Sequence, residues 1–218
     1  MTSPGPSGFF DSAGVWCQVL TAPRGQHRRP ALFLDRDGVL VEEVLYLHRV
    51  EDVAILPGAA ETIVAANRRE VAVVIVTNQA GIARGYYGWR EFEAVQQAIF
   101  SGLRQSGAQV DAVLACPHHP RGVEPYGHPA HPARKPQPGM LLRAAELLGI
   151  ALELSWIVGD KASDLLAGRA AGLRGGLLVM TGHGPEHCEA ARAMRTPQFE
   201  VLLADSIQSA AKLIDLLM

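Results

Sequence analysis

Residues 31–38 read Ala-Leu-Phe-Leu-Asp-Arg-Asp-Gly, a short apolar run that leads two carboxylates, Asp35 and Asp37, into a glycine turn. Such a run is typical of a buried strand in a parallel sheet, and open α/β sheets bind ligands at the carboxyl ends of these strands. Two carboxylates this close repel each other unless a cation joins them, and Mg²⁺ prefers oxygen ligands. The stretch predicts an α/β fold with a magnesium site; the alternative for this pair alone is a turn with two solvated acids.

Other polar side chains in the chain follow apolar runs or precede predicted helices in the same way. They are Thr77 and Asn78 after the run 71–76, Arg134 and Lys135 before a Pro-x-Pro-Gly helix entry, and Asp160, Lys161 and Asp164 after the run 155–158. In an α/β sheet these positions converge at one edge. The convergence favours a functional site over two isolated acids in a turn.

The order of apolar and amphipathic segments predicts the fold class. We expect strands near 31–35, 71–77, 110–115, 155–159, 176–180 and 200–203, and helices near 58–69, 89–106, 139–149, 162–171, 185–195 and 205–217. This alternation is typical of a doubly wound parallel sheet. Between Gly38 and the second strand there is room for little beyond one helix, so we expect no large cap domain and an open active site.

Composition and length limit the kind of protein this is. The chain has 218 residues, 48% of them hydrophobic, and a net charge of −2, which fits one compact domain and excludes a disordered or polybasic nucleic-acid-binding protein. It has no run of 18 apolar residues, so we expect no membrane span. The start of the chain lacks the features of a signal peptide, and three scattered cysteines argue against a disulfide framework. We expect a cytoplasmic monomer.

Residues 1–29 differ in composition from the rest. They are rich in Gly, Pro, Ser and Arg and have little periodicity. We expect a poorly ordered or surface-draped arm over 1–29, which Val15-Trp16-Cys17 could pin to the body, and one α/β domain over 30–218.

Four ordered motifs carry a resemblance to a known family. They are Asp35-x-Asp37-Gly38, Thr77-Asn78, Lys135 and Gly159-Asp160-Lys161-x-x-Asp164. In this order they resemble the haloacid dehalogenase (HAD) superfamily of phosphotransferases. Residues 34–38, 76–85, 116–120 and 134–140 are similar to the branch of D-glycero-D-manno-heptose 1,7-bisphosphate 7-phosphatases, and histidinol-phosphate phosphatases share much of that pattern.

The resemblance implies a Mg²⁺-dependent phosphate monoester hydrolase that works through an aspartyl phosphate. Asp35 is the expected nucleophile, and Asp37 is expected to protonate the leaving oxygen and later to activate water. The resemblance implies that Mg²⁺ is held by the carboxylates of Asp35 and Asp160 and by the backbone carbonyl of Asp37. Thr77, the backbone N–H of Asn78 and Lys135 would stabilise the phosphoryl group.

Substrate specificity is expected to come from cationic and polar groups at the mouth of the site. Besides Asn78, the candidate substrate-binding residues are Arg134, Lys161, Glu43, Tyr46 and Arg84. The resemblance implies removal of the C7 phosphate of a heptose 1,7-bisphosphate, and guanidinium groups suit the second anionic group of such a substrate. Histidinol phosphate or another small sugar phosphate is the alternative substrate.

A second group of residues lies in a proline-rich segment between Cys116 and Arg134. Its candidate zinc ligands are Cys116, His118, His131 and His128. The phosphatases that this chain resembles show Cys-x-His followed by Cys-x-Cys, and here His131 and Ala133 stand at the last two cysteine positions. One ligand is therefore exchanged and another lost, so the segment either binds a structural zinc with a recruited fourth ligand or is a metal-free loop.

Two other classes of protein are rivals for this sequence. A phosphoryl-receiver domain also has an acidic Mg²⁺ pocket, but it carries its acceptor Asp on a later strand and is much shorter. A catalytically inactive binding protein could share the fold, but every residue needed for turnover is present here.

Overall fold

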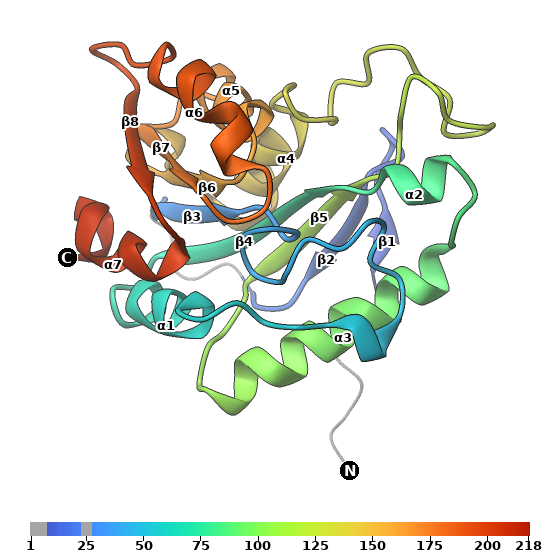
Figure 1. The fold of residues 1–218 in the computed structure, drawn as a ribbon, viewed down its shortest axis with the longest axis horizontal. Helices are drawn as coiled ribbons and strands as arrows, with labels where there is room; N and C mark the ends of the chain where they lie inside the picture. Colours follow the sequence, from blue (N-terminus) through green and yellow to red (C-terminus); the bar gives the residue numbers. More distant parts are fainter. Residues whose placement is uncertain (1–7, 23–27) are drawn as a thin grey trace.

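The predicted apolar runs form the strands of one sheet in the computed structural model, which describes residues 8–22 and 28–218 (Figure 1). In the described part of the chain the sheet has eight strands in the order β1-β2-β5-β4-β3-β6-β7-β8. The strands are β1 (Phe9–Phe10), β2 (Trp16–Val19), β3 (Ala31–Leu34), β4 (Ala72–Asn78), β5 (Ala112–Cys116), β6 (Trp156–Gly159), β7 (Gly175–Val179) and β8 (Glu200–Ala204). Strands β3 to β8 are parallel, which confirms the predicted fold class.

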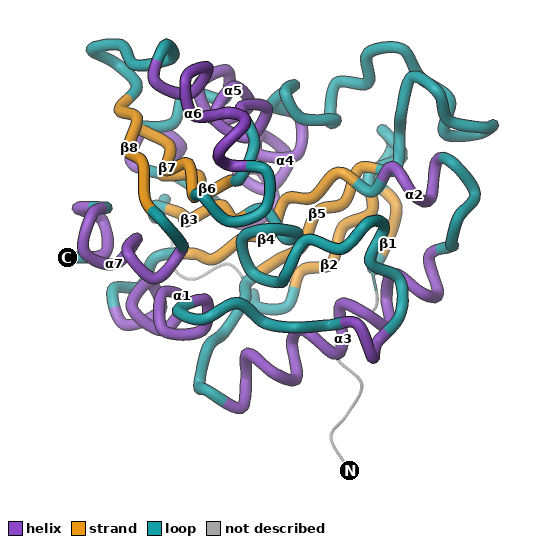
Figure 2. The backbone as a smooth tube through the Cα atoms, in the orientation of Figure 1, coloured by secondary structure: helices purple, strands orange, loops and turns teal. Residues whose placement is uncertain are grey.

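Helices cover both faces of this sheet, as Figures 1 and 2 show. One face carries α4 (Gly139–Leu148), α5 (Ala162–Ala170) and α6 (Gly184–Arg192), and the other carries α1 (Ala59–Arg68), α3 (Trp89–Gln105) and α7 (Ala210–Leu213). Neighbouring side chains of a strand point to opposite faces. Phe33 therefore packs with Leu141 of α4, whereas Leu34 belongs to the core around Phe92 of α3. Both faces are apolar, as expected for central parallel strands.

The structure differs from the predicted N-terminal arm over part of its length. Strands β1 and β2 form an antiparallel pair, and β2 pairs antiparallel with β5, so this segment extends the sheet. Trp16 is buried and its ring lies 5.1 Å edge-on to Phe92 and 6.1 Å from Trp89. The burial of this aromatic side chain outweighs the turn-rich composition around it. The rest of the predicted arm, residues 1–7 and 23–27, lies outside the described residues.

The C-terminal segment and one short helix also differ from the sequence prediction. Residues 205–217 form α7 between two 3₁₀ turns, Ile207–Ser209 and Asp215–Leu217, instead of one helix. The helix is interrupted at Ile214, whose backbone is extended and whose side chain is buried in the core. The hydroxyl of Thr62 donates to the carbonyl of Ile207 at 3.0 Å and so connects this segment to α1. Helix α2 (Ala80–Ala83) was not predicted, because four residues show no helical periodicity.

The connections leave the carboxyl edge of the central strands open. Between β3 and β4 the chain has a 3₁₀ turn (Val50–Asp52) and α1, as predicted for a chain without a large cap. The long segment between β5 and α4, which contains the Cys and His residues, extends from the same edge of the sheet (Figure 1). None of the helices in residues 8–22 and 28–218 has the length and apolar character needed to cross a bilayer.

Candidate active site

Three neighbouring strands supply the centre of the candidate site. Asp35 follows β3, Thr77 and Asn78 end β4, and Asp160 follows β6. Strand β3 pairs with β4 on one side and with β6 on the other, so these residues leave the sheet at one edge. This is where a parallel sheet binds its ligands.

The side chains at this edge line an open cleft of about 490 Å³. Nine of the predicted site residues are in its lining: Asp35, Asp37, Glu43, Tyr46, Thr77, Asn78, Arg134, Lys135 and Lys161. Asp160 is not in the lining, because it is fully buried, and Arg84 also lies outside the lining. The fold thus collects residues from positions 35 to 161 in one cleft.

Lys135 is a buried cation that joins two acids. Its Nζ lies 3.0 Å from Oδ1 of Asp35 and 2.6 Å from Oδ1 of Asp164, and it donates to the carbonyl of Val76 at 2.8 Å. Burial by itself would lower the pKa of Lys135, but the carboxylates of Asp164 and Asp35 outweigh it and raise this pKa above its ordinary value. Lys135 is therefore a fixed positive charge at the floor of the cleft.

Asp160 is a buried acid whose Oδ2 lies 3.8 Å from Nζ of Lys161. Its Oδ2 accepts the backbone N–H of His183 at 2.9 Å, but its buried Oδ1 has no hydrogen-bond partner. Burial, and then the nearby charge of Asp35, raise the pKa of Asp160 to about 7. Oxygens of Asp35, Asp160 and Asp164 all lie within 4.8 Å of one another. A buried carboxylate oxygen without a partner, in a set of oxygen donors, fits a divalent cation such as Mg²⁺.

Two glycines leave room for this carboxylate. Gly38 and Gly182 have φ of +77° and +55°, and a Cβ at either position would press against Oδ2 of Asp160. Both backbone conformations and the close approach require glycine here. The glycine of the Asp-x-Asp-Gly stretch is thus explained by its contact with an acid more than 120 residues later in the chain.

The side chain of Asp37 is not part of this cluster of acids. Both of its carboxylate oxygens accept hydrogen bonds from the guanidinium of the preceding Arg36, at distances from 2.9 to 3.2 Å. Asp37 therefore lines the cleft as a separate acid, and its side chain is not placed as a metal ligand. The resemblance had assigned only its backbone carbonyl to the metal.

Thr77 and Asn78 have different surroundings. The hydroxyl of Thr77 accepts a hydrogen bond from the Gln79 amide at 2.8 Å. The Asn78 side chain makes two bonds to the backbone of Lys135, because its amide donates to the carbonyl at 3.0 Å and its oxygen accepts the N–H at 3.1 Å. The Asn78 side chain thus fixes the backbone of Lys135. The group of Asn78 that was predicted to contact the substrate is its backbone N–H, which these two bonds do not use.

The rim of the cleft has two polar groups. On one side Lys161 lies 3.3 Å from Glu43, whose carboxylate is also 3.7 Å from the His183 ring. On the other side Arg84 donates to the hydroxyl of Tyr46 at 2.8 Å, and its other nitrogen is 3.4 Å from His119. Arg84 therefore contacts Tyr46, a residue of the cleft lining, without lining the cleft itself, whereas Arg134 is in the lining.

The Cys and His residues between β5 and α4 do not surround one point. The rings of His118 and His131 are stacked 3.8 Å apart at an interplanar angle of 7°. A metal lies in the plane of each imidazole that binds it, and two parallel planes share no point, so these rings cannot bind the same ion in this arrangement. Among the described residues, the groups of three or more potential ligands within 4.8 Å contain none of the four predicted zinc ligands.

His131 has partners other than a metal. Its Nδ1 accepts the backbone N–H of Ala133 at 3.2 Å, and its Nε2 lies 3.0 Å from the carbonyl of Ala13. The Sγ of Cys116 lies 3.8 Å from Nδ1 of His131. His118 has no hydrogen-bond partner on either nitrogen, but it stacks on His131. His128 accepts the backbone N–H of Ala130 on its Nδ1 at 3.1 Å. Counting His118, His128 and the Cys116 thiol as possible donors still gives fewer than the four ligands of a structural zinc site.

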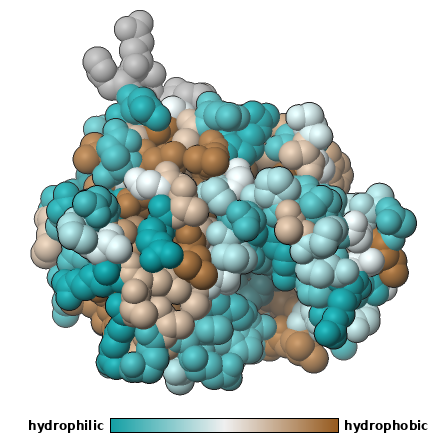
Figure 3. All heavy atoms as spheres, turned by 90° about the horizontal axis from the view of Figure 1, so that it is seen from above, coloured by the Kyte–Doolittle hydropathy of each residue, from teal (hydrophilic) through white to brown (hydrophobic). Residues whose placement is uncertain are grey.

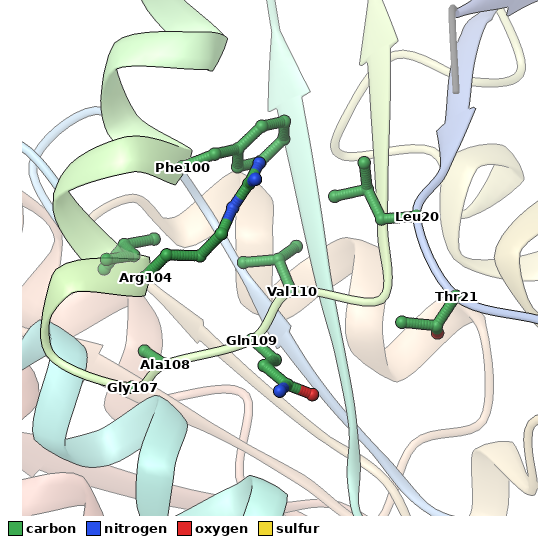
Figure 4. Close-up of a pocket in the computed structure, with 9 residues that line it drawn as sticks. Leu20, Thr21, Phe100, Arg104, Gly107, Ala108, Gln109 and Val110 are labelled. Atoms are coloured by element: carbon green, nitrogen blue, oxygen red, sulfur yellow. The ribbon is translucent and has the colours of Figure 1, made fainter. Parts of the chain in front are cut away.

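A second cavity, of about 310 Å³, lies away from all of these residues (Figure 4). Its lining includes Leu20, Phe100, Arg104 and Val110, and Arg104 lies over the Phe100 ring at 5.9 Å. Val110 precedes β5, whereas the catalytic edge is at the other end of that strand. No predicted site residue lines this cavity, so the chemistry is assigned to the cleft at the carboxyl edge.

Comparisons with known proteins agree with this geometry. The family model described as HAD-hydrolase-like matches residues 132–209. A D-glycero-beta-D-manno-heptose-1,7-bisphosphate 7-phosphatase from Mesorhizobium japonicum is 46% identical over 166 residues, 76% of each chain. A D-glycero-alpha-D-manno-heptose-1,7-bisphosphate 7-phosphatase from Photorhabdus laumondii is 34% identical over 191 residues, 87% of this chain and 100% of the relative.

Solved structures give the same result. A HAD-like phosphatase from Mesorhizobium loti superposes with a TM-score of 0.85 at 38% identity, over 98% of this chain and 96% of that one. The D,D-heptose 1,7-bisphosphate phosphatase of B. bronchiseptica, complexed with magnesium and phosphate, has a TM-score of 0.73 at 29% identity, over 84% and 96%. The chain belongs to the HAD-like hydrolases, in the family of the heptose 1,7-bisphosphate 7-phosphatases. It is a phosphatase of that superfamily, as the sequence predicted.

Four residues of the site were not singled out from the sequence: Arg36, Gln79, Tyr87 and His183. Arg36 and Gln79 each adjoin a motif residue, so proximity to the motifs was the signal that could have found them. Tyr87 and His183 have no such signal. His183 acts through its backbone N–H on Asp160, a contact that any residue type could make.

Proposed function

We propose that this phosphatase removes the C7 phosphate of a D-glycero-D-manno-heptose 1,7-bisphosphate. The observation that carries the proposal is the group formed by Lys135 and three acids, Asp35, Asp160 and Asp164, at the edge of the open cleft. Relatives whose names state this substrate are up to 46% identical to the chain, and they support the choice of sugar. The absence of a cap between β3 and β4 suits an extended substrate.

Asp35 is the nucleophile of this reaction. One of its carboxylate oxygens attacks phosphorus, the bond between phosphorus and the C7 oxygen breaks, and the leaving oxygen takes the proton of Asp37. A water then attacks the aspartyl phosphate and gives a proton to Asp37. The bond between phosphorus and the Asp35 oxygen breaks, which regenerates the Asp35 carboxylate and releases inorganic phosphate. Lys135 holds Asp35 in place at 3.0 Å, so that the attacking group does not need to be ordered for each turnover.

The phosphoryl group is stabilised by donors that the fold has already placed. The hydroxyl of Thr77, the backbone N–H of Asn78 and the ammonium of Lys135 come from one strand end and from the segment bonded to it. Fixed donors of this kind stabilise the charge that develops on the oxygens of the transferring group. Mg²⁺ would be held by the carboxylates of Asp35 and Asp160 and, as the resemblance implies, by the carbonyl of Asp37, and it would supply a counter-charge for phosphate and nucleophile.

The second phosphate of the substrate is bound at the rim. Arg134 lines the cleft, and one of its nitrogens donates to the carbonyl of His118 at 3.0 Å, which fixes the direction of the guanidinium. Lys161, Glu43 and Tyr46 line the same cleft and contact the sugar. Arg84 contributes through Tyr46. A cationic rim favours a bisphosphate over histidinol phosphate, whose amine is itself a cation.

The metal requirement of the protein is then magnesium alone. We infer that the Cys/His loop folds without zinc, the second of the two alternatives that the sequence leaves open. The parallel stacking of His118 on His131 and the backbone partners of His131 support this. We also infer that the domain begins before residue 30, because β1 and β2 are strands of its sheet.

The protein is proposed to act as a cytoplasmic monomer. All residues assigned to the reaction come from one chain, and Cys17, Cys116 and Cys188 are free thiols, as in a reducing compartment. Gel filtration with light scattering tests the monomer, and cell fractionation tests the location.

Initial rates of phosphate release with Mg²⁺ test the substrate. The panel contains both anomers of heptose 1,7-bisphosphate, histidinol phosphate and simple sugar 6-phosphates. We expect the highest kcat/KM for a heptose bisphosphate, with phosphate released from C7. A higher kcat/KM for histidinol phosphate would overturn the substrate assignment and leave the phosphatase activity in place.

A further inference from the structure

Arg36 stands between the two acids of the Asp-x-Asp stretch and is among the most buried side chains of the protein. It is 1% exposed, although arginine is a surface residue in most proteins. Its Nε and Nη2 each contact both carboxylate oxygens of Asp37, at 2.9 to 3.2 Å. A two-pronged pair of this kind fixes the direction of a carboxylate as well as its position.

Helix α3 holds the other side of this guanidinium. The Nη1 of Arg36 donates to the side-chain oxygen of Gln96 at 3.3 Å, and its carbon lies 5.6 Å from the centre of the Phe92 ring. Phe92 and Gln96 are four residues apart, so they share one face of α3, and both are buried. The guanidinium is thus held on a rigid element and cannot follow Asp37 if that side chain moves.

Gln79 links the same group to the phosphoryl-binding side of the site. Its oxygen accepts hydrogen bonds from Tyr87 and, at 3.4 Å, from Nη2 of Arg36. Its nitrogen donates to the Thr77 hydroxyl at 2.8 Å and to Oδ2 of Asp37 at 3.4 Å. Arg36 and the Tyr87 hydroxyl both donate to the side-chain oxygen of Gln79, so the side-chain nitrogen is the group that faces Thr77 and Asp37.

Tyr87 keeps its proton in this network. Burial raises the pKa of Tyr87 to about 12, so its hydroxyl remains a donor to Gln79. Gly81 makes this contact sterically feasible, because a Cβ there would overlap the Tyr87 ring. The network therefore runs from Tyr87 through Gln79 to Thr77 and Asp37, with Arg36 as its only charged donor among these residues.

We propose that Arg36 is a positioning residue for the proton-transfer steps: with Gln79 it holds the Asp37 carboxylate toward the leaving oxygen and in register with Thr77. This deepens the proposed function and rests on the role of Asp37 in it. The leaving alcohol of a sugar phosphate needs a proton as its bond to phosphorus breaks, whereas p-nitrophenolate leaves without one. Arg36 should therefore matter for one kind of substrate and much less for the other.

Arg36→Lys is the test, because lysine keeps the charge and loses the planar fork. Single-turnover rates are measured with Mg²⁺ for the heptose bisphosphate and for p-nitrophenyl phosphate. We expect the rate of sugar release to fall about 30-fold, less than the roughly 100-fold or more that general acid catalysis contributes, because Asp37 itself remains. The rate of nitrophenolate release should change less than about threefold. With p-nitrophenyl phosphate the variant should also show a burst of about one nitrophenolate per chain, since hydrolysis of the aspartyl phosphate still needs Asp37 as a base.

A matched control is a second Arg–Asp pair with little exposure, at the opposite end of the sheet. Arg29 lies 2.8 Å from Asp111, and Arg29→Lys makes the same chemical change outside the site. It should leave the ratio of the two single-turnover rates within about twofold of wild type, whatever it does to the melting temperature. Equal losses on both substrates in Arg36→Lys, or an unchanged rate of sugar release, would overturn the proposal.

Gln96→Met keeps the proposal testable if Arg36→Lys does not fold. It leaves Arg36 in the chain and removes one of the acceptors that hold the guanidinium. We expect the rate of sugar release to fall about threefold or more and the rate of nitrophenolate release to stay nearly unchanged. Equal losses in the two rates would contradict the role of Arg36. If wild type releases phosphate from neither substrate, it is the proposed function that fails, before any variant is compared.

Discussion

Two regions of this molecule collect residue types that bind metals, and the structure treats them differently. At the carboxyl edge, oxygens of Asp35, Asp160 and Asp164 lie within 4.8 Å of one another. In the loop between β5 and α4, two imidazoles stack 3.8 Å apart, and the nitrogens of His131 contact backbone groups. Figure 3 shows that hydrophilic residues cover much of one face of the molecule, whereas Asp35, Asp160 and Asp164 are buried.

The difference is one of charge balance. The carboxylates of Asp35, Asp160, Asp164 and Glu43 face two ammonium groups, those of Lys135 and Lys161, so two negative charges remain when all are ionised, as many as one divalent cation neutralises. Neutral imidazoles and a thiol carry no such excess. An excess of negative charge at a site is thus a better indication of a bound cation than the presence of Cys and His residues.

Asp35→Asn is the change with the largest expected effect on this comparison. An amide cannot attack phosphorus, so we expect phosphate release to fall by at least about 10⁴-fold in a protein that still folds. Circular dichroism checks the fold and initial rates check the activity. Asp215→Asn, far from the cleft, is the control and should keep wild-type rates; a folded Asp35→Asn protein with substantial turnover would exclude an aspartyl phosphate.

Asp160→Asn tests whether the unmatched oxygen is the metal ligand. We expect the Mg²⁺ concentration for half-maximal activity to rise about 100-fold, because the site loses one of its charged ligands. Glu43→Gln is the matched control: Glu43 also lies near Asp160, but it is already paired with Lys161. Its Mg²⁺ dependence should shift less than about threefold. Similar shifts in both variants would mean that the cation binds closer to Glu43.

Arg134→Ala tests the link between the two regions. Because the carbonyl of His118 orients Arg134, the loop would serve the reaction by presenting a cation to the substrate. We expect kcat/KM to fall about 30-fold for the heptose bisphosphate, the size of a lost charge-assisted contact, and about threefold or less for a sugar monophosphate. Arg121→Ala, an exposed arginine of the same loop, is the control. Equal losses on both substrates would remove Arg134 as a specificity residue.

The sequence predicted most of the fold because central parallel strands are apolar on both faces and need little context to be found. It missed β2, where Trp16 is buried against Phe92 of α3, and the broken C-terminal helix, where Ile214 has an extended backbone and a side chain buried in the core. Both errors have one cause: a contact between residues far apart in the chain outweighs local composition.

The site shows the same division. Asp35, Lys135 and Asp160 could be predicted because their residue types and positions after strands point to chemistry. The burial of Arg36 and the backbone contact of His183 with Asp160 could not, because each depends on which groups face one another. Asp164 was part of a predicted motif, but the geometry of its ion pair with Lys135 depends on the fold in the same way. The zinc ligands were predicted from residue types and from the spacing in the phosphatases that the chain resembles, and neither shows whether four donor atoms converge.

Magnesium affinity should depend on pH through Asp160. Its pKa is raised to about 7 in the metal-free protein, first by burial and then by Asp35, whereas an Asp in an unfolded chain titrates near about 4. Between these values the folded metal-free protein holds a proton that the unfolded chain lacks, so raising the pH through this window lowers its stability. Mg²⁺ must displace that proton, and calorimetry should show an affinity about tenfold lower at pH 6 than at pH 8. An affinity that does not change with pH would contradict a protonated Asp160.

Removing the thiol of the loop should have the smallest effect of all. Cys116 is fully buried in β5, and burial raises its pKa to about 11, so it is a protonated, apolar side chain in a parallel strand. Cys116→Ala should therefore lower the melting temperature by a few degrees, as a small cavity does, and leave kcat within about twofold. Elemental analysis of protein purified without chelator should find less than about 0.1 zinc per chain, since a stable site needs four ligands. One zinc per chain, lost together with resistance to proteolysis in Cys116→Ala, would mean that the histidines rearrange around a metal. Both regions would then bind a metal. They would differ in the metal that they bind, zinc in the loop and magnesium at the carboxyl edge, and charge balance would not explain the difference.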